Sequence, residues 1–265
     1  MNRTPSYIFS RSSEGLSRLR RRIADKRHVM LFLDYDGTLT PITSAPEFAV
    51  LSAEMRMHVD ALSCKHGIEI SIVTGRSLTD IQRHIGLPGL GYAANHGLQI
   101  LYRSRRWTHP RAALLQSRLK LSERSLRKTL SHVPGALIEN KGLTLSIHYR
   151  NVAAKYLPVL KAAVEAEAFA QQDEMKLASG KKVLELKPNV NWGKGDAVRQ
   201  IIARSGHSDP LVVYIGDDVT DEDAFAALPD GITVRVGTSA RTNARYYVKN
   251  VEGVRRLLSA LYAML

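Results

Sequence analysis

Acidic and hydroxyl-bearing motifs follow three apolar runs in this sequence. The runs lie at residues 28–33, 68–73 and 211–215, and they lead into DYDGT (34–38), TGR (74–76) and GDD (216–218). Oxygen ligands from carboxylates, waters and a substrate phosphate suit an octahedral Mg²⁺ ion. A carboxylate can also attack phosphorus, and a second one two residues along can donate a proton to the leaving oxygen and then activate water. The residue types therefore point to metal-assisted chemistry on a phosphate ester.

The spacing of the acids favours a functional site over a structural role. A lone DxD pair is often structural, whereas DYDGT directly after one apolar run together with GDD directly after another is a specific pattern. Asp34, Asp36 and Asp217 would repel one another in a low-dielectric cleft unless a cation lay between them. Because ligands of open α/β sheets bind outside the carboxyl ends of the strands, the three run ends predict one shared site.

Strands and helices that would bring these ends together are predicted before residue 103 and after residue 188. Each apolar run predicts a buried parallel strand. The spacing of Met55, Val59 and Leu62 predicts a helix between the first two strands, and Ser77 begins another helix that ends at Gly86. Strands and helices that alternate in this way predict an α/β fold with a Rossmann-like parallel sheet.

The pattern changes between residues 103 and 188. This stretch predicts a basic amphipathic helix at 111–132, a hairpin around Lys141-Gly142, a second helix at 153–169 and a second hairpin around Ser179-Gly180. After Pro188 the alternation of helix and strand resumes. The expected domains are a basic N-terminal arm (1–27), an α/β core (28–102 and 189–265) and an inserted α+β cap domain (103–188).

The charge of the chain is large and unevenly placed. The 38 Lys and Arg residues against 25 Asp and Glu give +13. Residues 1–30 hold 8 basic and 2 acidic residues, net +6, and residues 103–135 hold 9 and 1, net +8, so the other 202 residues sum to −1. A basic excess raises nucleic acid, acidic lipid or anionic substrates as partners. We keep a nucleic-acid-binding regulator only as a remote alternative, since no known module and no aromatic interleaving accompany the Arg tracts.

The arm and the cysteine content bear on location. The arm is rich in Arg and Ser, which is typical of an organelle transit peptide, but a basic helix at about residues 14–26 with its Arg face in water is the favoured interpretation. The single cysteine, Cys64, excludes an internal disulfide and suits a reducing compartment; we expect it to be a small core residue. No run approaches about 18 apolar residues. A cytoplasmic monomer without a membrane partner is expected.

A resemblance to a known family can now be stated. DYDGTLTPI, IVTGRS, a later Lys and GDDVTDEDAF resemble the four motifs of the haloacid dehalogenase superfamily of phosphohydrolases, in the variant found in trehalose-6-phosphate phosphatases. The likeness covers nearly the whole chain from about residue 28. It implies an Mg²⁺-dependent phosphatase that hydrolyses trehalose 6-phosphate through an aspartyl-phosphate intermediate, in trehalose biosynthesis. The alternative is the same chemistry on another sugar phosphate, such as sucrose phosphate.

The resemblance implies roles for four catalytic residues. Asp34 would be the nucleophile and Asp36 the general acid and base. Thr74, where the family more often has Ser, would hydrogen-bond the phosphoryl group. Lys194 would neutralise charge on the nucleophile and on the phosphoryl oxygens, which is what phosphoryl transfer requires.

The resemblance also implies the metal ligands. Asp34 and Asp217 would bind Mg²⁺ through their carboxylates, and Asp36 through its backbone carbonyl. Asp218 and Asp221 would hold metal-bound waters or Lys194.

Substrate-binding residues complete the set that the resemblance implies. They are Gly75, Arg76, Asn95 and His96 in the core and Glu139, Lys141 and Glu185 in the cap. Charged side chains suit this role because charge-assisted hydrogen bonds to sugar hydroxyls are strong and directional. Simpler interpretations stay open: an ion pair in a hairpin turn for Glu139 and Lys141, and a solvated strand residue for Glu185. Likewise, Arg76 could cap a helix or pair with an acid, and His96 could brace a turn.

Overall fold

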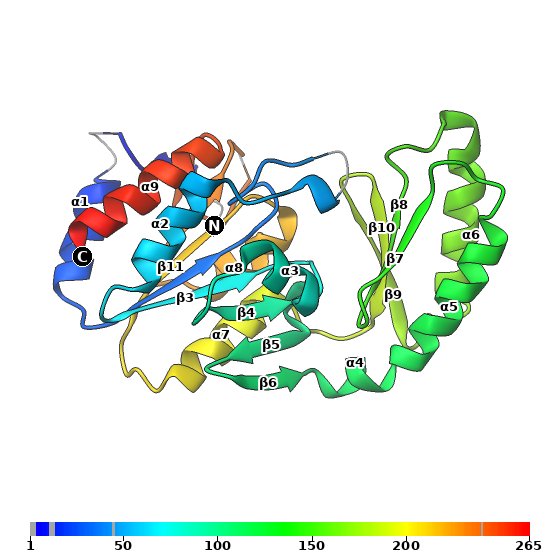
Figure 1. Ribbon diagram of the computed structural model, residues 1–265, viewed down its shortest axis with the longest axis horizontal. Helices are drawn as coiled ribbons and strands as arrows, with labels where there is room; N and C mark the ends of the chain where they lie inside the picture. Colours follow the sequence, from blue (N-terminus) through cyan, green and yellow to red (C-terminus); the bar gives the residue numbers. More distant parts are fainter. Residues whose placement is uncertain (1–3, 11–13, 44–45, 240) are drawn as a thin grey trace. The chain divides into compact units, whose positions relative to one another are not determined.

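The chain folds into two compact units. The computed structural model describes residues 4–10, 14–43, 46–239 and 241–265 (Figure 1). The core unit comprises residues 1–107 and 192–265, and the inserted unit comprises residues 108–191. These divisions lie three to five residues beyond the expected domain boundaries, and the N-terminal arm is part of the core unit.

A nine-stranded sheet forms the centre of the core unit, in the order β1-β13-β12-β11-β2-β3-β4-β5-β6. Neighbouring strands from β1 to β4 run parallel, and β5 is antiparallel to β4. The strands are β1 (Ser6–Tyr7), β2 (Val29–Leu33), β3 (Ile68–Val73), β4 (Gly91–Ala94), β5 (Gln99–Tyr102), β6 (Arg105–Thr108), β11 (Leu211–Gly216), β12 (Ile232–Val236) and β13 (Tyr246–Val248). Every residue of β2 and of β11 is buried, as expected for parallel strands covered on both faces.

Helices cover both faces of this sheet. One face packs against α1 (Gly15–Ala24), α2 (Ala53–Ser63), α3 (Leu78–Ile85) and α9 (Val251–Met264). The other face packs against α7 (Lys194–Ser205) and α8 (Glu222–Ala227). Short 3₁₀ turns lie at Pro46–Phe48, Asn95–Gly97 and Val219–Asp221. The predicted α/β class with a parallel-sheet core is confirmed.

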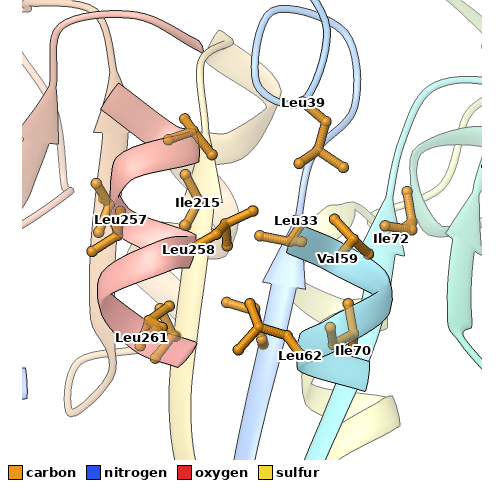
Figure 2. Packing of buried hydrophobic residues seen from close by; sticks show 14 of the residues in the cluster. Leu33, Leu39, Val59, Leu62, Ile70, Ile72, Ile215, Leu257, Leu258 and Leu261 are labelled. Atoms are coloured by element: carbon orange, nitrogen blue, oxygen red, sulfur yellow. The ribbon is translucent and has the colours of Figure 1, made fainter. Parts of the chain in front are cut away.

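Apolar side chains of α2 and α9 pack against the sheet in one buried cluster. Figure 2 shows leucines of α9, including Leu258, and Val59 and Leu62 of α2 against side chains of the central strands, including Leu33 and Ile215. Each fully buried side chain of this size contributes about 1.5–3 kcal/mol through removal from water. This packing fixes the position of Leu33, which directly precedes Asp34.

The inserted unit contains one antiparallel sheet in the order β7-β8-β10-β9. Its strands are β7 (Leu137–Asn140), β8 (Leu145–His148), β9 (Met175–Gly180) and β10 (Val183–Pro188). Its helices are α4 (Pro110–Leu114), α5 (Gln116–Thr129) and α6 (Leu157–Phe169), with a 3₁₀ turn at Ala154–Tyr156. The single helix expected at 111–132 is interrupted at Leu115, where φ −90° and ψ 0° depart from helical values.

The described part of the N-terminal arm is built into the core unit. Tyr7 belongs to β1, which pairs with β13, and Ile8, Leu19 and Ile23 are buried in the same cluster as the central strands. Arg18, Arg20 and Arg21 of α1 are exposed, whereas Arg22 is partly buried and donates to the backbone carbonyl of Asp230. Residues 1–3 and 11–13 of the arm lie outside the described residues. Within the described chain, no helix has the length and apolar character needed to cross a membrane.

The expectation that Cys64 is a core residue is wrong. Its side chain is exposed, because α2 ends at Ser63 and Cys64 lies at the C-cap, off the buried stripe of Met55, Val59 and Leu62. The strands at the sheet edges, β1, β5, β6 and β13, were not predicted from the sequence. They are two to four residues long and carry too little periodicity to be recognised.

We expect Leu258→Ala to lower the free energy of unfolding by about 2–5 kcal/mol, because it leaves a cavity in the core. Leu265→Ala, a change at the partly exposed end of the same helix, serves as the control and should alter it by less than about 0.5 kcal/mol. Equilibrium denaturation measures both. Equal effects of the two changes would contradict the packing described above.

Candidate active site

The three strand ends singled out in the sequence lie on neighbouring strands. β2 lies between β11 and β3, with Leu33 paired to Ile215 on one side and to Ile72 on the other. Asp34, Thr74 and Asp217 follow these strands directly, so they emerge at the same edge of the sheet. This is the edge at which open α/β sheets bind ligands.

A buried lysine joins two of the carboxylates. The Nζ atom of Lys194 donates hydrogen bonds to Oδ1 of Asp34 and to Oδ1 of Asp221, each 2.8 Å away. The Lys194 side chain is only 2% exposed, and both acids are buried as well. A buried charge is tolerated when it is paired and hydrogen-bonded, so the three groups depend on one another.

Asp221 is fully occupied by protein donors. Its Oδ1 atom also accepts the hydroxyl of Tyr214 at 2.7 Å, and its Oδ2 atom accepts the backbone N–H of Asp218 at 2.9 Å. Asp221 therefore holds Lys194 in place. Tyr214 is not among the site residues predicted from the sequence. Its hydroxyl in the middle of the apolar run 211–215 is a signal that could have identified it.

Charge and burial shift the pKa values of this group in a consistent way. Burial raises the pKa of Asp34 well above its usual value; Lys194 opposes this shift, and the nearby carboxylates of Asp221 and Asp217 add to it. Burial lowers the pKa of Lys194, but its two carboxylate partners outweigh burial and raise it. Lys194 therefore stays protonated, and a further positive charge would favour the ionised form of Asp34.

The acidic cluster could bind a metal ion. One carboxylate oxygen from each of Asp34, Asp217 and Asp221 lies within 4.8 Å of the others. The Oδ2 atom of Asp34 is buried and, among the described residues, has no hydrogen-bond partner. Gly37, at φ +89°, lets the backbone approach Asp217 so closely that a Cβ atom would collide with its carboxylate. The donors are all oxygens, which fits a hard divalent cation.

The TGR segment presents a hydroxyl next to this cluster. Thr74 is buried, and its Oγ1 atom accepts the backbone N–H of Arg76 at 3.1 Å, which leaves the hydroxyl proton available for another acceptor. Gly75 is required because a Cβ atom there would collide with the ring of His96.

The side chain of Arg76 is engaged by two acids. Its Nε and Nη2 atoms donate to the two carboxylate oxygens of Asp36, both at 2.7 Å, and its Nη1 atom donates to Asp80 at 2.7 Å. Burial lowers the pKa of the guanidinium, but the bonds to Asp36 and Asp80 raise it above its usual value. Of the open interpretations of Arg76, pairing with an acid describes the contacts observed.

The segment after β4 forms a tight turn against the TGR segment. Asn95 and His96 have φ values of +50° and +56°, in the left-handed region that non-glycine residues seldom adopt. Their backbone N–H groups donate to the carbonyls of Arg76 and Thr74 at 2.8 and 2.9 Å. Trp192 Nε1 donates to the carbonyl of Gly97 at 2.9 Å. Such local strain is characteristic of functional sites.

In the inserted unit the three predicted residues share one face of the sheet. Glu139 and Glu185 both pair with Ser146, from either side, and the alternating apolar residues of these strands pack against the helices on the other face. The Oε1 atom of Glu185 accepts bonds from Thr144 and Ser146 at 3.1 and 3.2 Å and lies 3.5 Å from Lys141 Nζ. Glu185 is 7% exposed, so it is not a solvated strand residue.

Glu139 has a histidine partner in that unit. Its Oε2 atom lies 2.9 Å from Nε2 of His148 on the neighbouring strand. Lys141 is placed by the turn between β7 and β8, and its ion pair reaches to Glu185 on β10. The inserted unit thus carries a row of charged and hydroxyl side chains across three strands.

We expect Asp221→Asn to lower the free energy of unfolding by about 1.5–3 kcal/mol, because the buried ammonium of Lys194 exchanges one of its two charged acceptors for a neutral one. Asp60→Asn changes an exposed carboxylate on α2 and serves as the matched control, with an effect below about 0.5 kcal/mol. Equilibrium denaturation at neutral pH compares the two variants. A loss for Asp221→Asn no larger than that of the control would show that Lys194 does not depend on Asp221.

This chain is similar in sequence to proteins of known name. Residues 32–252 match the family model described as trehalose-phosphatase. A trehalose-phosphate phosphatase of Mycobacterium marinum is 33% identical over 213 residues, 78% of this chain and 53% of that protein. Trehalose-phosphate phosphatase B of Arabidopsis thaliana is 34% identical over 254 residues, 90% of this chain and 67% of that protein. The chain thus spans about half the length of the mycobacterial relative.

Solved structures agree with the sequence comparison. A trehalose-6-phosphate phosphatase related protein is 27% identical, with a TM-score of 0.79 over 89% of this chain and 97% of its own. The C-terminal domain of the C. albicans trehalose-6-phosphate phosphatase is 21% identical and shares the fold, with a TM-score of 0.80 over 100% and 99% of the two chains. Because the family model spans most of the chain and the listed relatives exceed 30% identity, this chain belongs to the trehalose-phosphatase family and has its haloacid dehalogenase-like fold.

Proposed function

We propose that this chain is an Mg²⁺-dependent phosphatase that hydrolyses trehalose 6-phosphate to trehalose and phosphate. The observation that supports this most strongly is the buried Lys194, bonded to Asp34 beside the carboxylate of Asp217. A carboxylate nucleophile, a fixed positive charge and an oxygen-ligand cluster are the parts that transfer of a phosphoryl group to protein requires. The named relatives carry the same activity in their names.

Mg²⁺ would be held by the carboxylates of Asp34 and Asp217 and by the backbone carbonyl of Asp36. When bound, it would offset negative charge on the nucleophile and on the phosphoryl oxygens. The second oxygen of Asp34, which has no hydrogen-bond partner among the described residues, supports this assignment. Asp221 is occupied by Lys194 and Tyr214, so its contribution is to position Lys194. We assign Asp218 to a metal-bound water.

In the first step a carboxylate oxygen of Asp34 attacks phosphorus. The bond between phosphorus and the sugar oxygen breaks, and its electron pair stays on that oxygen, which takes a proton from the carboxylic acid of Asp36. Trehalose leaves, and Asp34 carries the phosphoryl group as an acyl phosphate. Asp36 is then an ionised carboxylate.

In the second step Asp36 acts as a base. Its carboxylate takes a proton from water as the water oxygen attacks phosphorus, and the bond between phosphorus and Asp34 breaks with its electron pair on the carboxylate. Inorganic phosphate is released, and both acids return to their starting protonation states. Thr74 and Lys194 donate hydrogen bonds to the phosphoryl oxygens in both steps.

Binding of the sugar is assigned to charged side chains. We propose that Glu139, Lys141 and Glu185 bind hydroxyls of trehalose, supported by their shared face of the inserted sheet and by their charged or hydroxyl neighbours. A sugar without those hydroxyls would leave buried polar groups unpaired, which makes such a site selective. We assign Gly75, Asn95 and His96 to the phosphate end of the substrate.

Location and assembly remain expectations from the sequence. We propose a monomeric enzyme of the cytoplasm with a small sugar phosphate as its partner and without nucleic-acid or membrane partners.

Asp34→Asn should reduce phosphate release from trehalose 6-phosphate by at least about 10³-fold, because the amide cannot form the acyl phosphate. Asp60→Asn is the control and should retain full activity. Release of inorganic phosphate is measured with an excess of Mg²⁺ and again after chelation of the metal. Full activity of Asp34→Asn would overturn the mechanism.

The substrate is tested by a panel of sugar phosphates. We expect kcat/KM for trehalose 6-phosphate to exceed that for sucrose 6-phosphate or glucose 6-phosphate by at least about 10²-fold, since unpaired buried groups oppose the other sugars. A higher kcat/KM for another sugar phosphate would retain the chemistry and reject the substrate.

A further inference from the structure

The loop that follows β2 leaves Asp36 one main degree of freedom, the rotation of its side chain. The backbone carbonyl of Tyr35 accepts the N–H groups of Leu39 and Thr40, and Gly37 donates to the carbonyl of Thr40 at 2.8 Å. These bonds form a tight turn that fixes the backbone at Asp36. Whatever holds the carboxylate of Asp36 therefore decides where its reactive oxygens lie.

Arg76 holds that carboxylate with both of its parallel donors. Two bonds of 2.7 Å form a bidentate pair, the arrangement in which a guanidinium fixes both the position and the plane of a carboxylate. The side chain of Arg76 is 6% exposed, whereas that of Asp36 is 42% exposed. The arginine is therefore the rigid partner, and Asp36 is the one with room to move.

Arg76 is itself held from two other directions. Its Nη1 atom donates to Asp80, one turn along the chain, which in turn contacts Nδ1 of His84 at 3.3 Å. Its guanidinium lies 5.1 Å from the ring centre of Tyr35, close enough for a cation–π contact. All three nitrogens of the guanidinium are thus used within the core unit.

We infer that Arg76 is a positioning residue for Asp36: it holds the carboxylate that remains when the general acid gives its proton to the leaving oxygen, and it does not bind the sugar. The inference rests on the proposed function of Asp36 and on the contacts above. A lysine could not replace it fully, because an ammonium is a point charge without the planar pair of donors.

The inference predicts an effect that depends on the leaving group. A sugar oxygen leaves as a strong base and needs the proton of Asp36, whereas p-nitrophenolate is a weak base and leaves without one. Because kcat/KM reports the steps up to the release of the leaving group, misplacing Asp36 should lower it for the sugar phosphate only. A purely structural role of Arg76 would lower it for both substrates.

The test compares Arg76→Gln and Arg76→Lys with the wild-type enzyme on trehalose 6-phosphate and on p-nitrophenyl phosphate. For Arg76→Gln we expect kcat/KM to fall at least about 30-fold on the sugar phosphate and to stay within about threefold on p-nitrophenyl phosphate. Arg76→Lys should lie between Arg76→Gln and wild type. The matched control is Arg83→Gln, an exposed arginine on α3, the helix that follows Arg76, which should change neither value.

Binding and folding are measured separately. In the Asp34→Asn background, which cannot turn over, Arg76→Gln should change the calorimetric affinity for trehalose 6-phosphate by less than about threefold, because a positioning residue makes no ground-state contact with the sugar. If Arg76→Gln does not fold, Asp80→Asn is measured instead. It should show the same dependence on the leaving group, with a smaller fall in kcat/KM.

Three outcomes would overturn the inference: an equal loss on both substrates, a loss confined to affinity, or no loss at all. Failure of the proposed function is seen separately. In that case the wild-type enzyme itself releases no phosphate from trehalose 6-phosphate, or Asp36→Asn shows no preference between the two leaving groups. If another sugar phosphate is the better substrate, the same comparison is made with that compound.

Discussion

The buried ammonium of Lys194 is the group on which the rest of the site depends. The ammonium is only 2% exposed, and it is stable there because two carboxylates accept its hydrogen bonds. One carboxylate lies at the end of β2 and the other in the turn after β11. Removing either acid leaves the buried ammonium with one carboxylate and with a donor that has lost its acceptor. The lysine therefore fixes the end of β2 relative to the β11 turn, and Asp34 cannot move away without breaking a buried pair.

The surroundings of the lysine follow from this requirement. Tyr214 and the backbone of Asp218 satisfy the remaining acceptors of Asp221, so that this acid serves only to hold Lys194. The Oδ2 atom of Asp34 has no hydrogen-bond partner in the described chain and is the oxygen that we assign to the metal ion and the attack on phosphorus. Burial raises the pKa of Asp34, and the charges of Asp221 and Asp217 raise it further. Because the acids outnumber the lysine, a divalent cation fits the cluster.

Much of this could be predicted from the sequence because the motifs lie next to strong local signals. Asp34 and Asp217 follow strands whose residues are all buried, and Ser77 caps its helix as its position before Asp80 indicates. Lys194 lies 160 residues from Asp34, so their contact depends on the family resemblance and not on any local pattern.

Other contacts could not be predicted, because they depend on tertiary packing. The pair between Arg76 and Asp36 joins two loops through side-chain rotation, which spacing does not reveal. Cys64 is exposed because α2 ends at Ser63, one residue before it. The exact ends of helices and strands are the features that a sequence predicts least well. The basic helix of the arm, by contrast, agrees with the prediction, since Arg18, Arg20 and Arg21 of α1 are exposed while Leu19 and Ile23 are buried in the core.

The proposed mechanism requires that Asp34 becomes covalently phosphorylated during turnover. Rapid mixing with trehalose 6-phosphate, followed by acid quenching and borohydride reduction, converts an aspartyl phosphate to homoserine, which peptide mass spectrometry locates. In the wild-type chain we expect homoserine at position 34 and at no other aspartate position. Phosphate release under the same conditions with Asp34 unmodified would contradict it.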